Sequence, residues 1–296
     1  MIEVTNCPIC NGKNFVPYLQ CCDHSVTQET FSLIKCTKCG LVITSPRPDD
    51  LEIQKYYASS TYISHLGTAQ TLLDRIYLFA RSFTLRWKWS IVERNILPTL
   101  EKKILDFGCG TGEFLRTAKQ HSWNVAGVEP SENARTQASP EVFNHIKSSL
   151  PNFSNQTFNV ITLWHVLEHV SDLDSTIGDL KNHLTQEGTL FIAVPNHSSW
   201  DGKHYQEKWA GYDVPRHFWH FNSKNMLMLL ENHSLELVEI IPMRLDAFYI
   251  SLLSEKYSHN RMSAVGLIKA FFYGCFSNVN AKKNNEYSSL IYVARK

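Results

Sequence analysis

Residues 104–121 constrain the fold more than any other part of the sequence. A short apolar run, Ile104 to Phe107, is followed by glycines at positions 108, 110 and 112 and then by an amphipathic segment over 113–121. A run of this length is typical of a buried strand, and the glycines permit a sharp turn with positive φ. The pattern predicts a strand–loop–helix unit whose exposed backbone N–H groups suit a polar or anionic ligand.

Short apolar runs and amphipathic runs continue to alternate after this loop. We expect strands over 124–129, 158–164, 189–194, 235–241 and 288–294, another strand near 145–147, and helices over 113–121, 173–184, 225–232 and most of 245–285. Strands that alternate with helices in this way form a parallel sheet with helices on both faces. The sequence therefore predicts an α/β fold.

Two acidic residues frame the glycine loop. Asp106 lies in the preceding strand, and Glu129 follows Gly112 by 17 positions at the tip of the next strand, where a carboxylate can accept both hydroxyls of a ribose. The glycine spacing is G-x-G-x-G, whereas a nicotinamide-binding domain, the alternative, has G-x-G-x-x-G. The segment resembles the Asp-x-Gly-x-Gly-x-Gly motif of the class I S-adenosylmethionine (SAM) dependent methyltransferases.

This resemblance implies a Rossmann-like seven-stranded sheet with one antiparallel strand, and SAM as the cofactor. It assigns the glycine loop to the amino-acid part of SAM, Glu129 to the ribose, and the end of strand 158–164 to a position beside the cofactor. Core packing is the alternative role for Trp164. The cofactor-binding residues expected from the resemblance are Asp106, Gly108, Cys109, Gly110, Gly112, Glu129, Pro130, Ser149, Leu150, Leu163, Trp164 and His165.

The helical segment 49–100 is expected to cover the amino-acid end of the cofactor. Four of its polar residues are candidates for binding the SAM carboxylate: Tyr62, His65, Arg81 and Lys88. A solvated helix face is the alternative interpretation for each of them.

Two C-x-x-C pairs near the N-terminus predict a zinc site. Cys7 and Cys10 form the first pair, Cys36 and Cys39 form the second, and 25 residues separate the pairs. Two such pairs can supply four thiolates to one tetrahedral Zn²⁺. The apolar pattern of residues 31–35 predicts a strand that leads into the second pair. A segment of 45 residues with few core residues needs such a cross-link, so we expect a structural Cys₄ zinc ribbon.

Other readings of the cysteines fit less well. Cys21, Cys22 and His24 are further candidate ligands that we expect to be spectators. A redox-active C-x-x-C of the thioredoxin type is disfavoured because there are two pairs and no βαβ context around them.

The chain is expected to have three parts. These are a zinc ribbon over 1–48, a helical cap or linker over 49–100, and a SAM-binding domain over 101–296 with substrate-side insertions at 197–222 and 245–287. A Cys₄ ribbon before such a domain is similar to the architecture of sugar C-methyltransferases that act on nucleotide-linked deoxysugars.

The chain also resembles a broader group of bacterial methyltransferases through two short motifs. These are Tyr62-Ile63-Ser64-His65 after the ribbon and Pro215-Arg216-His217 in the first insertion.

Residues 165–169 are a candidate for a second metal site. His165, Glu168 and His169 share one face of a helical turn, and the segment looks like the Glu-x-x-Glu-His segment of ubiquinone-biosynthesis O-methyltransferases, which binds a divalent ion. A histidine at the first position is a poor ligand for Mg²⁺. Packing around the site is therefore the favoured role.

The first insertion concentrates candidate catalytic residues where open α/β sheets bind their substrates. His217 lies between Arg216 and two aromatic residues, surroundings that favour a neutral imidazole able to act as a general base, and Tyr212 is the second choice. A hydrogen-bonded lid role is the alternative for each histidine there. We expect this insertion and the helical regions 49–100 and 245–285 to enclose a partly apolar pocket.

The composition excludes several classes of function. A net charge of +1 gives no overall electrostatic attraction for nucleic acid or for an anionic membrane. No apolar run is long enough to span a bilayer, and no leader is evident. We therefore expect a cytoplasmic protein. The expected function is transfer of a methyl group from SAM to an oxygen or carbon atom of a small molecule that is sugar- or lipid-linked. The alternative is a catalytically silent interaction module that docks a partner through its ribbon.

Overall fold

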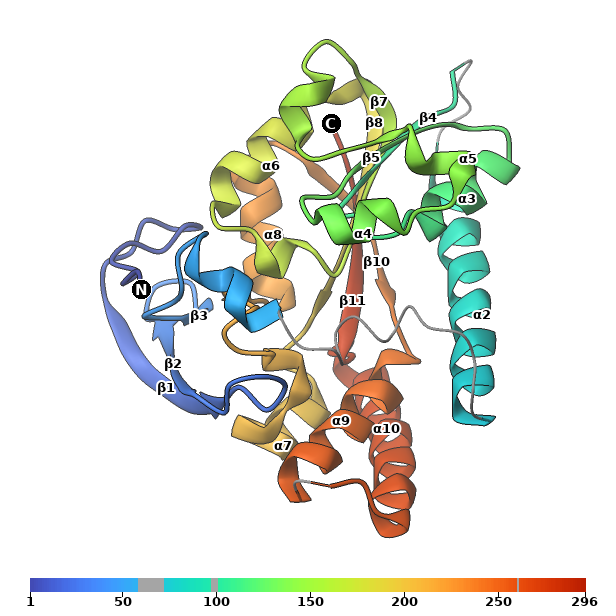
Figure 1. Cartoon of the computed structure of the whole chain (residues 1–296). Helices are drawn as coiled ribbons and strands as arrows, with labels where there is room; N and C mark the ends of the chain where they lie inside the picture. The colour runs from blue at the N-terminus through green and yellow to red at the C-terminus, as the bar shows by residue number, and fades with distance from the viewer. Residues whose placement is uncertain (58–71, 97–100, 260) are drawn as a thin grey trace.

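A seven-stranded sheet forms the centre of the computed structural model, which describes residues 1–57, 72–96, 101–259 and 261–296, with the side chains of 72–82 excluded (Figure 1). Its order is β10-β11-β8-β7-β4-β5-β6, and β11 is antiparallel to both β8 and β10 while the other pairs are parallel. The strands are β4 (Lys103–Phe107), β5 (Asn124–Val128), β6 (Ile146–Lys147), β7 (Phe158–Trp164), β8 (Leu184–Pro195), β10 (Glu236–Pro242) and β11 (Ser289–Arg295). The expected Rossmann-like sheet of seven strands with one antiparallel strand is confirmed.

Helices cover both faces of this sheet, as Figure 1 shows. The helices of one face are α2 (Leu72–Asn95), α3 (Glu113–Gln120), α4 (Glu132–Thr136) and α5 (Pro140–Phe143), and those of the other are α6 (Leu173–Asn182) and α8 (Ser223–Asn232). Alternate residues of each strand point to opposite faces. Accordingly Ile104 belongs to the core beneath α2 and α3, whereas Leu105 belongs to the core beneath α6 and α8.

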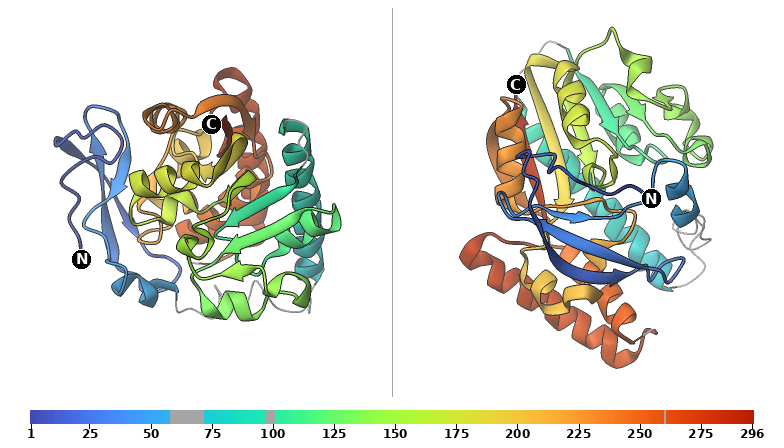
Figure 2. Two further views of the ribbon diagram at one scale, coloured as in Figure 1. Left: turned by 90° about the horizontal axis from the view of Figure 1, so that it is seen from above. Right: turned by 90° about the vertical axis from the view of Figure 1, so that its left-hand side faces the viewer.

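A second, antiparallel sheet is built from the N-terminal segment and one distant strand. It contains β1 (Phe15–Cys22), β2 (Thr30–Cys36), β3 (Val42–Thr44) and β9 (Trp219–His220) in that order. The sequence indicated only the second of these strands. The last strand comes from the first insertion, 197–222, so the N-terminal sheet is continuous with that insertion and lies beside the central sheet (Figure 2).

The connections at the carboxyl ends of the central strands carry the remaining elements. After β7 comes η4 (Leu167–His169), and after β8 come α7 (Trp200–Tyr205), η5 (Gln206–Lys208) and η6 (Ala210–Tyr212). The segment after β10 forms α9 (Asp246–His259) and α10 (Ala264–Asn284), while η1 (Glu52–Tyr57) follows the N-terminal sheet and η3 (Leu150–Phe153) follows β6. Among the described helices, none has both the length and the apolar character needed to cross a membrane.

Candidate active site

The glycine loop between β4 and α3 leaves open space beside its backbone. Gly108 has φ +75°, and a Cβ there would lie 2.5 Å from Val166 Cγ2, so packing alone excludes a side chain. Gly110 also has a positive φ, +54°, but a Cβ there would meet nothing within 4 Å. The loop is therefore tight where it contacts the protein and open at Gly110, where a ligand can approach the backbone.

Glu129 links this loop to the end of β5. Its Oε2 accepts a hydrogen bond from the Gly110 N–H at 2.9 Å, and its Oε1 accepts one from the Ser131 N–H at 2.8 Å. Each carboxylate oxygen has a second lone pair, so both can still accept hydroxyl protons from a ligand. Arg135 holds the turn after Glu129 by donating to the Glu129 and Pro130 carbonyl oxygens at 2.6 and 2.7 Å.

Asp106 is buried directly beneath the glycine loop. Burial raises the pKa of its carboxyl group to about 7, although the hydrogen bond donated by Thr162 Oγ1 at 2.7 Å opposes that rise. The positive charge of Lys88 also stabilises the ionised form. A carboxyl group with such a pKa gains most from a ligand that brings a positive charge.

The end of β7 lies beside the loop and carries Trp164 and His165. The Trp164 ring packs edge-to-face on Phe114 at 5.2 Å between centroids, and Lys88 Nζ lies 4.6 Å from the centre of the same ring. His165 has φ +59°, and its Nε2 lies 3.1 Å from Asp246 Oδ2. Burial lowers the pKa of His165, but the hydrogen bond and charge of Asp246, with Glu168, outweigh burial and raise it to about 9.

The remaining residues expected to bind the cofactor range from exposed to fully buried. Cys109 is half-buried in the loop, Pro130 is exposed after β5, and Ser149 is exposed with its hydroxyl 2.9 Å from Asn152 Oδ1. Leu150 and Leu163 are buried in the core. Tyr62, His65 and Arg81 lie outside the residues whose side chains the structure describes.

A polar cluster lies where β7 passes into η4. Glu168 is buried, and the ligand atoms of Glu168, His169 and His217 all lie within 4.8 Å of one another. The two imidazole rings meet edge-to-face at 4.5 Å between centroids. These three residues have the donor types and spacing that a cation needs. His165, which the sequence placed with Glu168 and His169, is not part of this cluster: its Nδ1 lies 3.5 Å from Glu168 Oε1, and its Nε2 pairs with Asp246 at 3.1 Å.

His217 is oriented by the backbone of its own insertion. It is 8% exposed, and its Nδ1 lies 2.9 Å from the Gly211 carbonyl oxygen, so Nδ1 carries the proton of that hydrogen bond. This leaves the lone pair of a neutral ring on Nε2, which lies 4.0 Å from Asp213 Oδ2. His217 can therefore accept a proton at Nε2.

Tyr212 and Arg216 face the N-terminal sheet. Tyr212 is 1% exposed, and burial beside Tyr18 raises the pKa of its phenol. Arg216 is equally buried and donates to Asp213 at 2.7 and 2.9 Å, to Asp23 at 2.9 Å and to the Tyr56 carbonyl oxygen at 3.0 Å.

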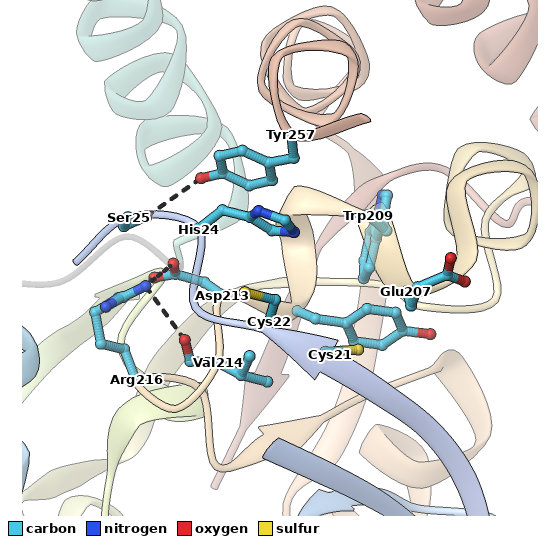
Figure 3. A pocket seen from close by; sticks show the side chains of 11 residues that line it. Cys21, Cys22, His24, Ser25, Glu207, Trp209, Asp213, Val214, Arg216 and Tyr257 are labelled. Atoms are coloured by element: carbon cyan, nitrogen blue, oxygen red, sulfur yellow. Dashed lines mark hydrogen bonds and ion pairs between the residues drawn. The ribbon is translucent and has the colours of Figure 1, made fainter. Parts of the chain in front are cut away.

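A small pocket lies at this junction. Figure 3 shows His24 and Cys22 of the N-terminal segment opposite Trp209 and Asp213 of the insertion, with Tyr257 of α9 above them. The pocket lies on the N-terminal side of the insertion and is not lined by the glycine loop.

The four cysteines of the C-x-x-C pairs come together at the end of the N-terminal sheet. Their sulfur atoms all lie within 4.8 Å of one another, with 3.4 Å between Cys7 and Cys39 and 3.5 Å between Cys10 and Cys36. Four thiolates on a tetrahedral Zn²⁺ would be about 3.8 Å apart, given Zn–S bonds of about 2.3 Å. The cluster fits a zinc ribbon.

The spectator cysteines lie elsewhere. Cys21 and Cys22 are at the far end of β1, and burial raises the pKa of both thiols, that of Cys21 to about 12. Such groups stay protonated near neutral pH. His24 stacks on Tyr257 at 4.6 Å between centroids.

Comparison with known families identifies the class of protein. The model of a family described as a methyltransferase domain matches residues 83–240, more than half of the chain. The chain belongs to this methyltransferase family. The chain therefore carries a methyltransferase domain, in agreement with the SAM-dependent class that the glycine loop and Glu129 predicted.

Similar proteins include O-methyltransferases. The ubiquinone biosynthesis O-methyltransferase of Actinobacillus pleuropneumoniae serotype 7 is 34% identical over 108 residues, 32% of this chain and 46% of that protein. The mitochondrial ubiquinone biosynthesis O-methyltransferase of Bos taurus is 26% identical over 170 residues, 51% of this chain and 46% of that protein. The chain thus spans about half the length of these curated relatives.

A solved structure shows the same fold. The magnesium protoporphyrin IX methyltransferase of Synechocystis PCC 6803, with bound SAH, aligns with a TM-score of 0.53 at 13% identity, covering 84% of this chain and all of that one.

Two charged residues near the site had no sequence signal. Asp246 pairs with His165, and Asp23 pairs with Arg216. The members of the first pair are 81 positions apart, and Asp23 and Arg216 are 193 apart, so only the tertiary fold could reveal them.

Proposed function

We propose that this methyltransferase transfers the methyl group of SAM to an oxygen or carbon atom of a small acceptor that is sugar- or lipid-linked. The observation that carries the proposal is the open face of Gly110, with the Glu129 carboxylate beside it and a polar cluster at the adjacent strand end. The glycine loop and the cluster both follow carboxyl ends of neighbouring strands, where open α/β sheets hold ligands.

Residues in and around the glycine loop each bind a different part of the cofactor in this proposal. Glu129 accepts the ribose hydroxyls, the backbone at Gly110 meets the amino-acid part, and Asp106 supplies a negative charge beneath the ammonium group. Ser149 and Leu150 follow β6 on the side where adenine would lie, and Trp164 and His165 border the methyl group. SAM, when bound, supplies an electrophilic methyl group.

His217 removes the proton from the acceptor in this proposal. The acceptor atom forms a bond to the methyl carbon while the carbon–sulfur bond breaks, and the acceptor proton moves to Nε2 of His217, leaving SAH and a protonated imidazole. Glu168 and Asp213 are anionic groups beside that ring and stabilise its charge. Tyr212 is the less suitable base because burial raises the pKa of its phenol.

The N-terminal cysteines bind a structural Zn²⁺ in this proposal. The support is the convergence of four sulfur atoms, three of them on buried residues. A closed Cys₄ set leaves no open position for catalysis, so the metal holds the fold of the ribbon.

The decisive experiment is mass spectrometry of acceptors incubated with enzyme and SAM. The first arm uses lipids that carry a hydroxyl group, because the curated relatives are named ubiquinone biosynthesis O-methyltransferases. Further arms use nucleotide sugars and lipid-linked sugars. The proposal expects SAH and a product heavier by one CH₂ unit, and NMR of the product gives the acceptor atom. SAM turnover that needs no small acceptor, or methylation only of a macromolecule, would contradict it.

A further inference from the structure

Helix α10 exposes its large apolar side chains and buries its small ones. The residues that it packs against the protein are Gly266, Ala270, Gly274, Ser277 and Ala281. Its large apolar residues at the surface, each 45–63% exposed, are Val265, Leu267, Ile268, Phe271, Phe272, Phe276 and Val279. A helix that faces water has the opposite arrangement, and contiguous apolar surface of this kind marks a binding site. We call these seven residues the α10 apolar face.

The orientation of α10 is fixed by its contacts. A Cβ at Gly274 would lie 2.6 Å from the ring of Phe248 on α9, so only a glycine allows this approach. Ser277 donates a hydrogen bond to the buried carboxylate of Asp201 at 2.6 Å. Rotating the helix to bury its phenylalanines would lose that bond and force large side chains against α9. The packing of α10 on α9 and Asp201 therefore keeps the α10 apolar face exposed to solvent.

The surroundings of the α10 apolar face are cationic. Five basic residues of the segment are exposed: Lys256, Arg261, Lys269, Lys282 and Lys283. Helix α10 itself contains no acidic residue. The two acidic residues of α9 are already engaged, Asp246 with His165 and Glu255 with the Tyr205 hydroxyl. A net charge of +1 for the whole chain thus conceals a local excess of positive charge.

We propose that the α10 apolar face docks on the surface of an anionic lipid bilayer. Phenylalanine and aliphatic side chains enter the boundary between headgroups and acyl chains, while the lysines contact anionic headgroups, as in helices that lie in the plane of a membrane. A second copy of the chain is a poorer occupant, since a symmetric contact would bring the same cations together.

The docked face lies next to the substrate side of the enzyme. Phe276 contacts the Trp200 ring at 4.7 Å between centroids, and Trp200 is the first residue of α7 in the insertion that carries His217. Docking through α10 would hold that insertion beside the bilayer surface. The proposal does not depend on which acceptor is methylated.

Co-sedimentation with vesicles tests the proposal. The full chain is mixed with vesicles of phosphatidylcholine alone or of equal parts phosphatidylcholine and phosphatidylglycerol. We expect binding to the second kind that weakens as salt is raised. Phe272→Glu should lower the partition coefficient about tenfold or more, because it removes an inserted ring and adds a charge of the wrong sign. Lys282→Gln combined with Lys283→Gln should lower binding to the anionic vesicles only.

Phe143→Glu is the matched control, because Phe143 is an exposed phenylalanine, 46% accessible, on α5 at the other end of the molecule (Figure 1). Its binding should equal that of the unmodified chain. Equal binding to both kinds of vesicle, or equal loss in Phe272→Glu and Phe143→Glu, would overturn the proposal. So would light scattering that shows a dimer which Phe272→Glu converts to monomers.

Discussion

Asp106 is the residue whose ionisation should set the pH dependence of cofactor binding. Burial raises its pKa to about 7, above the ordinary value of an aspartate, so the carboxyl group is protonated below that pH. SAM carries a positive charge and favours the ionised form. Binding therefore releases a proton at low pH, and affinity should fall about tenfold for each pH unit below 7 and level off above it.

Calorimetric titrations with SAM between pH 5.5 and 8.5 check this dependence. Asp106→Asn should bind more weakly and lose the slope. Asp179→Asn, an exposed aspartate on α6, should keep it. A slope that persists in Asp106→Asn would assign the proton to another group.

His217 is the residue expected to control turnover. His217→Ala should lower kcat by about 10²–10⁴-fold and leave the SAM affinity nearly unchanged, since the ring accepts a proton and does not touch the cofactor loop. Higher pH should restore part of the loss if the acceptor ionises by itself. Steady-state kinetics and SAM titration of the same variant give both quantities.

Tyr212→Phe is the companion variant for this test. It keeps the buried ring and removes only the hydroxyl. If Tyr212→Phe loses turnover and His217→Ala does not, the general base is the tyrosine.

At the scale of secondary-structure elements, the N-terminal segment with its four-cysteine cluster and the insertion 197–222 share a sheet. Val42 and Ile43 of β3 pair with His220 and Trp219 of β9, and the Thr44 hydroxyl donates to the His217 carbonyl oxygen at 2.7 Å. Loss of the metal should therefore disturb the acceptor side of the enzyme more than the SAM side.

Elemental analysis and activity of Cys36→Ser test this coupling. The unmodified chain should contain about one Zn²⁺, and Cys36→Ser should lose it together with most of the turnover while SAM still binds. Cys22→Ser, a substitution in the same sheet outside the cluster, should retain metal and activity. Freshly purified protein without zinc would contradict the assignment.

Local patterns explain which elements were predictable from the sequence. Strand β4 and helix α3 follow from an apolar run, three glycines and an amphipathic period, all within 18 residues. The pairing of β9 with β3 could not be predicted, because a two-residue strand has no periodicity of its own. The sequence placed Glu168 and His169 of the polar cluster together but could not add His217, because His217 is 48 positions from its nearest partner in the chain.

At the scale of the whole molecule, Arg216 connects three parts of the chain. Its guanidinium group joins Asp23 of the N-terminal segment, the Tyr56 carbonyl oxygen at the end of η1, and Asp213 of the insertion. The guanidinium and the Asp23 carboxylate are fully buried and the Asp213 carboxylate is half-buried, so removing Arg216 leaves uncompensated charge.

Arg216→Met should lower the free energy of unfolding by about 3–5 kcal/mol. Urea denaturation measures the change. Arg116→Met is the control, because Arg116 is exposed on α3 and its loss should cost less than about 0.5 kcal/mol. Equal stability of the two variants would show that the buried charges do not hold the parts together.

The central claim is that the loop from Asp106 to Gly112, with Glu129, binds SAM, and calorimetric titration of the purified chain with SAM tests it most directly. We expect a dissociation constant in the micromolar range, weakened by about 1–3 kcal/mol in Glu129→Ala through loss of charge-assisted hydrogen bonds to the ribose. Glu132→Ala, an exposed glutamate three residues further along, should bind as the unmodified chain does. The absence of SAM binding, or equal affinity in Glu129→Ala, would contradict the account.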